Sequence, residues 1–218
     1  MALFCIFLLS LLGMSATLPQ DMFGKMLVFP QETNTAHVRI TPSRENLGAV
    51  TVCLRYFTDL FRVFRVFTLS TPSYTNEVCG EMPLPFLRNT GVSFRELDYQ
   101  RNRWQSICAT WDAASGVVQL WVNGKPSTMK YVTNVTITGP MVIVIGQDEY
   151  SFGGGFKGAE SFVGMITDVH MWDYVLSPCH IYNHSQKFNF PAGNILNWNS
   201  VEFQITGRVL IQKEQNDC

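Results

Sequence analysis

Residues 108–126 read CATWDAASGVVQLWVNGKP, and this stretch decides the class of fold. Within it, residues 116–122 (GVVQLWV) meet Asn123-Gly124, which is the strongest short-range signal of a β-hairpin. Lys125-Pro126 then leads away from the turn. The stretch therefore predicts a strand that ends in a tight turn and opens a hairpin.

The pattern of strand and turn continues on both sides of this hairpin. Residues 50–57 (VTVCLRYF) have the β-branched and aromatic composition of strands, and residues 24–29 (GKMLVF) form a short apolar strand. Residues 141–145 (MVIVI) are a continuous apolar run, as in a strand buried on both faces. Residues 201–211 (VEFQITGRVLI) read as a closing strand with alternation broken at Gly207. We predict one all-β domain, a two-sheet sandwich.

One short helix is expected after Ser177-Pro178, because a cap-like serine and a first-turn proline precede the residues CHIYNHSQK. Cys179-His180 and His184 are expected to form one polar face of this helix. Their spacing is not that of a zinc site.

The composition excludes several classes of protein. The 218 residues carry 16 Lys+Arg against 17 Asp+Glu, a formal net charge of -1, whereas nucleic-acid binders carry a basic surplus. The same balance gives no support to a polybasic membrane-surface protein. Hydrophobic residues make up 46% and aromatic residues 13%, which is enough core material to exclude disorder. We expect a folded protein without nucleic-acid partners.

The start of the chain predicts secretion. Residues 1–12 (MALFCIFLLSLL) are apolar and uncharged, and the small-residue stretch 13–16 (GMSA) follows, as in a secretory signal peptide. A membrane span needs roughly 20 apolar residues, and this run is shorter. We expect a signal peptide at residues 1–16, a secreted domain at residues 17–218, and no membrane span.

In a secreted protein, cysteines can form disulfides and asparagines in sequons can be glycosylated. After cleavage, an odd number of cysteines remains, so at least one is free or bonded to another chain. The sequons at Asn134 and Asn183 are candidate N-glycosylation sites. The remaining cysteines are Cys53, Cys79, Cys108, Cys179 and Cys218.

No catalytic constellation is visible. Glu96 and Asp98 would lie on one face of a strand, as in some jelly-roll glucanases, but the second Glu of that pattern is replaced by Arg101. The glycine run 153–155 lacks the Lys-Ser/Thr of a P-loop and is expected to be a turn with positive φ. The histidines are scattered, and His170 is expected to be a half-buried structural residue of a strand. We predict that the protein is not an enzyme.

Several motifs match one known family. They begin with residues 108–116 (CATWDAASG) and 121–126 (WVNGKP), and only Ser106 departs from the usual His of that signature. The other matching segments are 51–56 (TVCLRY), 58–60 (TDL), 145–147 (IGQ), 151–154 (SFGG), 162–164 (FVG), 171–178 (MWDYVLSP) and 194–198 (NILNW). Together they span about residues 26–212, and over this range the chain resembles the pentraxins, in particular the short pentraxins.

The resemblance implies a flattened jelly roll of two antiparallel sheets with one helix after Pro178, and a disulfide between Cys53 and Cys108. Pentraxins assemble as cyclic discs, often pentamers. One face of the disc binds ligands through calcium, and the other presents the helix to complement and receptors. The resemblance thus implies a lectin-like, acute-phase type of binding protein of innate immunity that forms a homo-oligomer.

The calcium site that the resemblance implies is eroded in this chain. Tyr150 stands where the family has an Asp, Lys157 where it has a Glu, and Thr75 where it has the Asp of an Asp-Asn pair. Calcium takes six to eight hard oxygen ligands, so these replacements predict a weakened or lost site. The candidate calcium ligands that remain are Asn76, Asp148, Glu149 and Glu160.

Ligand recognition leaves several functions open. The family's phosphocholine pocket does not carry over, because the segment 76–108 does not align with it. Asn123 stands where one family member has an Asp implicated in complement contact. One hypothesis is a calcium-dependent pattern-recognition protein for phosphocholine or polysaccharide ligands. The second is a calcium-independent interaction or structural pentraxin, and the third is a jelly-roll glycosidase.

The resemblance also constrains the extra cysteines. It puts Cys79 on the ligand face and Cys179 on the helix face. Because a bridge needs Cα atoms within about 7 Å, we expect no Cys79–Cys179 bond within one subunit. We predict that Cys218 pairs with Cys179 of its own subunit or with a cysteine of a neighbour. Cys79 is then the unpaired thiol, and free thiols at all three positions are the alternative.

Overall fold

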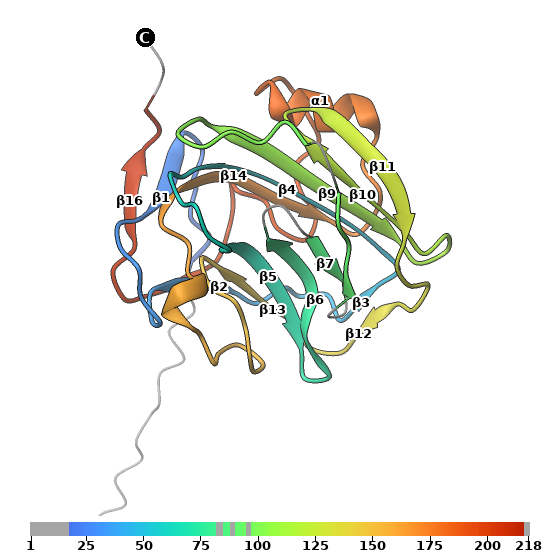
Figure 1. The fold of residues 1–218 in the computed structure, drawn as a ribbon, viewed down its shortest axis with the longest axis horizontal. Coiled ribbons are helices and arrows are strands. Elements are labelled where there is room, and N and C mark those ends of the chain that lie inside the picture. The colour runs from blue at the N-terminus through green and yellow to red at the C-terminus, as the bar shows by residue number, and fades with distance from the viewer. Residues whose placement is uncertain (1–17, 82–84, 88–89, 95–96, 216–218) are drawn as a thin grey trace, which may run out of the picture.

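The structure is a computed structural model that describes residues 18–81, 85–87, 90–94 and 97–215. Its strands form two seven-stranded antiparallel sheets, stacked as two layers, and a small ribbon of two strands (Figure 1). The predicted all-β sandwich is confirmed. Residues 1–16 lie outside the described residues. In the part of the chain that is described, no helix is long and apolar enough to cross a membrane.

The first sheet contains the longest strands. In spatial order it consists of β11 (Lys125–Tyr131), β10 (Val117–Val122), β9 (Gln105–Asp112), β4 (Ala49–Phe57), β14 (Gly164–Trp172), β1 (Lys25–Phe29) and β16 (Leu210–Lys213). The second sheet consists of β15 (Gln204–Thr206), β2 (His37–Ile40), β13 (Val142–Ile145), β5 (Arg65–Thr71), β6 (Tyr74–Glu81), β7 (Pro85–Leu87) and β8 (Thr90–Gly91). The ribbon pairs β3 (Asn46–Leu47) with β12 (Ile137–Thr138).

The predicted hairpin is confirmed. β10 and β11 pair on either side of Asn123 and Gly124, which have φ angles of 49° and 77°. Two consecutive residues with positive φ define the turn type that suits the twist of a two-residue hairpin.

The hydrophobic core fills the space between the two sheets. Its largest fully buried side chains include Trp198, Tyr56, Phe29, Phe64 and Phe67. All four residues of β13 are buried, so the prediction of a strand buried on both faces is confirmed. Aromatic rings in this core meet edge to face, as Phe29 and Phe162 do at a centroid distance of 5.8 Å.

The end of the chain differs from the prediction of one closing strand. β15 pairs with β2 in the second sheet, whereas β16 pairs with β1 in the first. Gly207 lies between them with a φ of 71°, and a Cβ at this position would lie 2.8 Å from the Cα of Ala36. Glycine therefore allows the chain to cross from one sheet to the other, which a pattern of alternation cannot reveal.

β14 contains a bulge at Asp168. The register against β4 shifts between Thr167 and His170, and Asp168 has a φ of 51°. Ile166 lies in the core before the bulge, and Val169 and Met171 lie in the core after it. The bulge therefore sets which side chains of β14 face the opposite side of the sheet.

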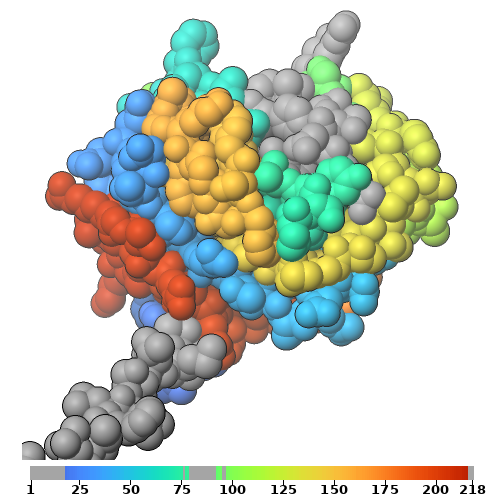
Figure 2. All heavy atoms as spheres, turned by 90° about the horizontal axis from the view of Figure 1, so that it is seen from below, coloured from blue at the N-terminus to red at the C-terminus, as the bar shows by residue number. Residues whose placement is uncertain are grey.

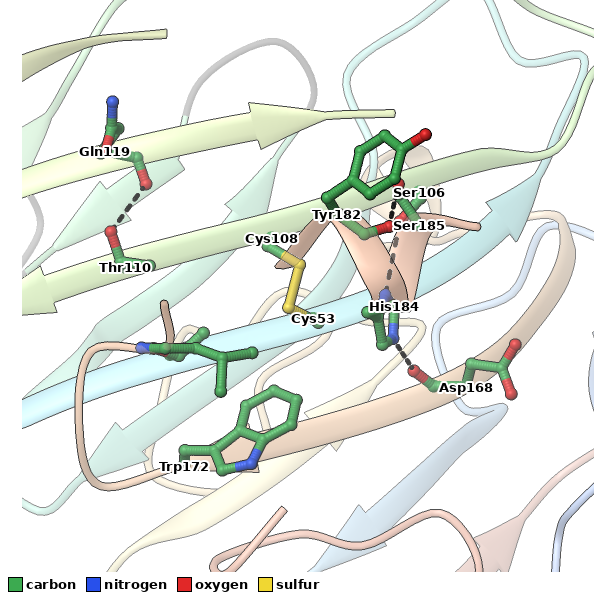
Figure 3. The surroundings of a disulfide bond; sticks show 12 residues. Cys53, Ser106, Cys108, Thr110, Gln119, Asp168, Trp172, Tyr182, His184 and Ser185 are labelled. Carbon is green, nitrogen blue, oxygen red and sulfur yellow. Dashed lines mark hydrogen bonds between the residues drawn. A yellow bond between two sulfur atoms is a disulfide. The ribbon is translucent and has the colours of Figure 1, made fainter. Parts of the chain in front are cut away.

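The helix α1 (Pro178–Ser185) covers the outer face of the first sheet (Figure 1). The side chain of Ser177 caps it by accepting a hydrogen bond from the His180 N–H at 3.3 Å. Beneath the helix, Cys53 of β4 and Cys108 of β9 are directly paired and form a disulfide (Figure 3). The helix and the disulfide that were expected are both confirmed. A small apolar cluster surrounds the disulfide, made of Trp121, Trp172, Leu176 and Ile181.

Candidate functional site

The candidate calcium ligands of the sequence meet in one loop. This acidic loop, residues 146–163, connects β13 to β14 and contains the short 3₁₀ helix η1 (Gly158–Glu160). It lies on the surface beside the segment between β1 and β2, where the loop is orange and that segment is blue in Figure 2. Gln147 anchors the loop there by donating hydrogen bonds to the carbonyls of Thr33 and Ala36 at 2.7 and 2.9 Å.

The glycine run forms the tip of the acidic loop. Gly153 and Gly155 have φ angles of 70° and 75°, as the turn prediction required, but Gly154 does not have a positive φ. Ser151 and Gly154 pair across the tip through mutual backbone hydrogen bonds of 3.1 and 2.9 Å. The tip therefore holds its shape through its own backbone.

The carboxylate of Glu149 is buried and fully engaged. It accepts hydrogen bonds from the Thr68 and Ser70 hydroxyls at 2.9 and 2.5 Å and from the Gly153 N–H at 2.7 Å. Burial raises the pKa of Glu149, while these donors oppose that rise. Through these hydrogen bonds, Glu149 connects β5 to the glycine tip of the loop.

Asp148 forms an ion pair with Arg65 of β5. The distance from Arg65 Nε to Asp148 Oδ2 is 3.1 Å, and both side chains are buried, with exposed fractions of 10% and 3%. Burial raises the pKa of Asp148 to about 6, and Arg65 opposes this rise. A guanidinium thus binds one of the carboxylates that the resemblance implied as a calcium ligand.

Tyr150, Lys157 and Glu160 form a second group at the surface of the loop. The Tyr150 hydroxyl donates to the Glu160 carboxylate at 2.7 and 2.9 Å from its two oxygens. The Lys157 ammonium lies over the Tyr150 ring, 3.5 Å from its centroid, as a cation–π contact. Although burial opposes it, the hydrogen bonds from Tyr150 and Asp148 lower the pKa of Glu160.

These contacts do not fit a calcium ion. Calcium requires six to eight oxygen ligands, and among the described side chains each loop carboxylate already binds a donor from the protein. Arg65 and Lys157 bring two positive charges to the loop, and Arg39 adds a third because it lies beside Gly153 and interacts with Glu149. These three cations balance the carboxylates of Asp148, Glu149 and Glu160, so a divalent cation would meet neither a free carboxylate nor a net negative charge there.

Two of the positions named from the sequence belong to β6. Thr75 is half-buried, and the side chain of Asn76 lies outside the described residues. β6 pairs with β5, so these positions lie on the strand next to the one that carries Arg65 and the two hydroxyls that bind Glu149. The structure brings Asp148, Glu149 and Glu160 into one loop, and Arg65 is the residue that the sequence reasoning missed.

The opposite face of the molecule holds two buried histidines. His170 is 2% exposed, so it is buried instead of half-buried as expected. His184 is 1% exposed, while Cys179 and His180 are exposed, so the prediction of one polar helix face is wrong. The reason is that His184 points into the sheet, where its Nε2 donates to the Asp168 carbonyl at 2.9 Å and its Nδ1 faces the Ser106 hydroxyl at 3.4 Å (Figure 3).

His184 and the two bridged cysteines lie close enough to suggest a metal site, since their ligand atoms are within 4.8 Å of one another. Both sulfurs are bonded to each other in the disulfide, however, and a metal requires thiolates. Burial lowers the pKa of His184 and lowers that of His170 to about 3, so both rings are neutral at physiological pH. The group is a packed structural cluster.

The remaining candidate residues are dispersed. Asp98 lies outside any strand and pairs with Lys125 at 3.2 Å, and Glu96 lies outside the described residues. Asn134 is exposed, whereas the Asn183 amide donates to the Asn189 carbonyl at 2.9 Å. Cys179 is exposed and unpaired among the described residues. The side chain of Cys79, and the whole of Cys218, lie outside them.

Comparisons with known proteins identify the family of this chain. A family model described as "Pentaxin family" matches residues 25–213. The chain is 36% identical to the serum amyloid P-component of Mus musculus, over 88% of each chain. It is 34% identical to the C-reactive protein of Sus scrofa, over 95% of this chain and 96% of that one. It is 35% identical to the mucosal pentraxin of Mus musculus, over 88% of each chain.

A solved structure shares the fold. The heptameric SAP-like pentraxin from Limulus polyphemus superposes with a TM-score of 0.78 at 21% sequence identity, over 88% of this chain and 95% of that one. The extracellular region of zebrafish Gpr126/Adgrg6 contains a similar fold, with a TM-score of 0.66 over 86% of this chain and 26% of that one.

Proposed function

The chain belongs to the pentaxin family, and on that premise we propose that it is a secreted, non-enzymatic binding protein of innate immunity that recognises its ligand without calcium. Serum amyloid P-component and C-reactive protein are the relatives that support the immune role. The apolar, uncharged residues 1–12 support secretion. Asn134, which is exposed, is the better of the two candidate glycosylation sites.

The observation that carries the calcium-independent part is the buried pair of Arg65 and Asp148. A guanidinium on the carboxylate neutralises the charge that a metal would otherwise neutralise. Removing a charged group from such a buried pair is costly, so the pair is a stable feature of the loop. This observation favours the calcium-independent pentraxin over the calcium-dependent one.

Calorimetric titration with calcium chloride tests this proposal. We expect no heat of binding below millimolar calcium and the same melting temperature in calcium and in EDTA. A matched variant with Arg65→Gln, Tyr150→Asp and Lys157→Glu restores oxygen ligands, and we expect it to bind calcium more tightly than the natural chain. Sub-millimolar binding by the natural chain would contradict the proposal.

We further propose a cyclic homo-oligomer. The two edges of the first sheet differ and both expose apolar side chains: Met129 and Tyr131 on β11 are 69% and 67% exposed, and Leu210 and Ile211 on β16 are 38% and 39% exposed. Contact between two different surfaces generates rings when the rotation closes. Light scattering during size exclusion, in EDTA, should give a closed oligomer for the natural chain and a smaller species for Met129→Glu. A monomer in both cases would contradict the ring.

We propose that the ligands are of the classes that the family implies, phosphocholine or polysaccharide, but that they bind in the presence of EDTA. Retention of the full secreted protein on phosphocholine and agarose resins with EDTA supports the proposal. Retention only in the presence of calcium would contradict the proposal and support the calcium-dependent hypothesis. Hydrolysis of a β-glucan by the natural chain, lost in Glu96→Gln, would instead favour the glycosidase.

A further inference from the structure

A cavity of about 610 Å³ opens on the helix face of the first sheet. It lies between β14, the end of α1 with the residues that follow it, and Glu214 near the C-terminus. Its volume falls in the range of about 300–1,000 Å³ that small-molecule sites occupy. We call it the helix-face cavity, and none of the acidic-loop residues lines it.

Aromatic side chains form one side of the cavity. The Phe190 ring packs against the rings of His170 and His184, with centroid distances of 5.1 and 4.9 Å. Phe23 and Phe188 also line the cavity and are 73% and 59% exposed. Exposed rings beside a cavity offer apolar faces on which a ligand can stack.

Asp168, Lys187 and Glu214 form the other side, and Arg55 behind them balances their charge. Arg55 Nη1 contacts Asp168 Oδ2 at 3.3 Å and Glu214 Oε1 at 2.9 Å, and Lys187 also pairs with Glu214 Oε1. These contacts use only one oxygen of each carboxylate. Among the described residues, Asp168 Oδ1 and Glu214 Oε2 accept no hydrogen bond, so two acceptors remain for a ligand.

His170 supplies a donor at the cavity. Its Nδ1 accepts the Gly193 N–H at 3.4 Å, so the proton of the neutral ring resides on Nε2. The described residues provide no acceptor for this N–H, and the side chain lines the cavity. The Nε2 atom does not belong to the fully buried polar atoms that lack a partner, so this N–H stays accessible to a ligand oxygen.

We infer that the helix-face cavity binds a neutral, hydroxyl-rich ring, such as a pyranose. A hydroxyl can donate to the open carboxylate oxygens and can accept from His170, whereas the C–H face of the ring stacks on phenylalanine. The two cations and two carboxylates cancel, which gives an ion no net attraction. This site does not depend on the proposed function, because no residue of the acidic loop lines the cavity.

Saturation-transfer NMR on the full secreted protein in EDTA tests the inference. The probes are the methyl glycosides of glucose, galactose, mannose and N-acetylglucosamine, with tetramethylammonium and methyl phosphate as ionic probes. We expect transfer to at least one glycoside and none to the ions. Absence of transfer to every glycoside, or transfer to the ions alone, would overturn the inference.

Matched variants locate the binding. Phe188→Ala should weaken glycoside binding by about tenfold, because it removes a stacking ring from the mouth. Phe61→Ala is the control, since Phe61 is 86% exposed and does not line the cavity. Asp168→Asn should also weaken binding, and Asn tolerates the positive φ of this position. Equal affinity in Phe188→Ala and the natural chain would place the sugar elsewhere and overturn the inference.

The same variants keep this inference distinct from the proposed function. Sugar binding that requires calcium and survives Phe188→Ala would contradict both proposals. Sugar binding in EDTA that survives Phe188→Ala and is lost in Tyr150→Phe would overturn only this inference.

Discussion

The acidic loop and the helix-face cavity hold the same types of residue in opposite ways. In the loop, the carboxylates of Asp148 and Glu149 are 2% and 1% exposed and are bound by Arg65, two hydroxyls and a backbone amide. In the cavity, Asp168 and Glu214 share Arg55 and each keeps one oxygen open. In the loop, groups of the protein already bind the two carboxylates, whereas in the cavity one oxygen of each carboxylate has no partner among the described residues.

This difference shows that charge counts do not identify a binding site. Both regions are close to neutral, and in both an arginine pairs with a carboxylate. What separates them is whether each polar atom already has a partner, because an engaged carboxylate gains little from a new ligand. Removing one partner at a time should therefore have different effects in the two regions.

The largest effect is expected from Arg65→Met in the acidic loop. It leaves the buried Asp148 without its guanidinium and should lower the free energy of unfolding by about 3–5 kcal/mol. Urea denaturation measures this loss. Arg62→Met is the control, because the Arg62–Glu32 pair is much more exposed and should cost at most about 1 kcal/mol. Equal losses in the two variants would mean that the loop does not depend on its internal cation.

The second prediction concerns the support of the helix face. Replacing Cys53 and Cys108 together with alanine removes a cross-link that spans 55 residues, and we expect a loss of about 2–4 kcal/mol in urea denaturation. Cys179→Ala, at an exposed and unpaired thiol, should stay within about 0.5 kcal/mol of the natural chain. A stable double variant would show that packing under α1 holds this face without the bond.

The third prediction separates the two regions by pH. The pKa of His170 is about 3 in the folded protein and 6.5 in the unfolded chain, so the unfolded chain binds more protons between these values. Stability contributed by His170 is therefore present above pH 6.5 and lost as the pH falls, by about 2 kcal/mol at pH 5. Asp148 acts in the opposite direction, because its folded pKa is raised to about 6 and acid favours its folded state.

Urea denaturation at pH 7 and pH 5 measures the histidine contribution as a difference. We expect the natural chain to lose more stability between these two values than His170→Gln, which cannot titrate. If both lose the same amount, His170 is not held neutral by burial.

The smallest effect is expected at the start of α1. Ser177→Ala removes the hydroxyl that caps the helix and should cost about 1 kcal/mol. Ser200→Ala, at an exposed serine outside α1, should be neutral. A cost near zero for Ser177→Ala would indicate that packing of Ile181 and Leu176 alone fixes the helix.

Local features of the fold could be predicted from the sequence. The Asn123-Gly124 turn and the Ser177 cap depend on residues that are neighbours in the chain, and both are confirmed. The pairing of Arg65 with Asp148 could not be predicted, because it joins β5 to the loop that follows β13, and these two segments are far apart in sequence. The burial of His184 was missed because the partner that turns it inward, the Asp168 carbonyl, belongs to a bulge without a sequence signal.

The bulge at Asp168 shifts the alternation of side chains along β14 by one residue. In an unbroken strand, Ile166, Asp168 and His170 would all face the core, because side chains alternate with period two. The extra residue moves the later part of the strand by one position, so Met171 enters the core and His170 and Trp172 lie under α1. Loss of the bulge with Asp168 kept in a regular strand would exchange these two sets of side chains and place an imidazole and an indole in the core between the sheets. The bulge thus determines which side chains of β14 reach the helix-face cavity.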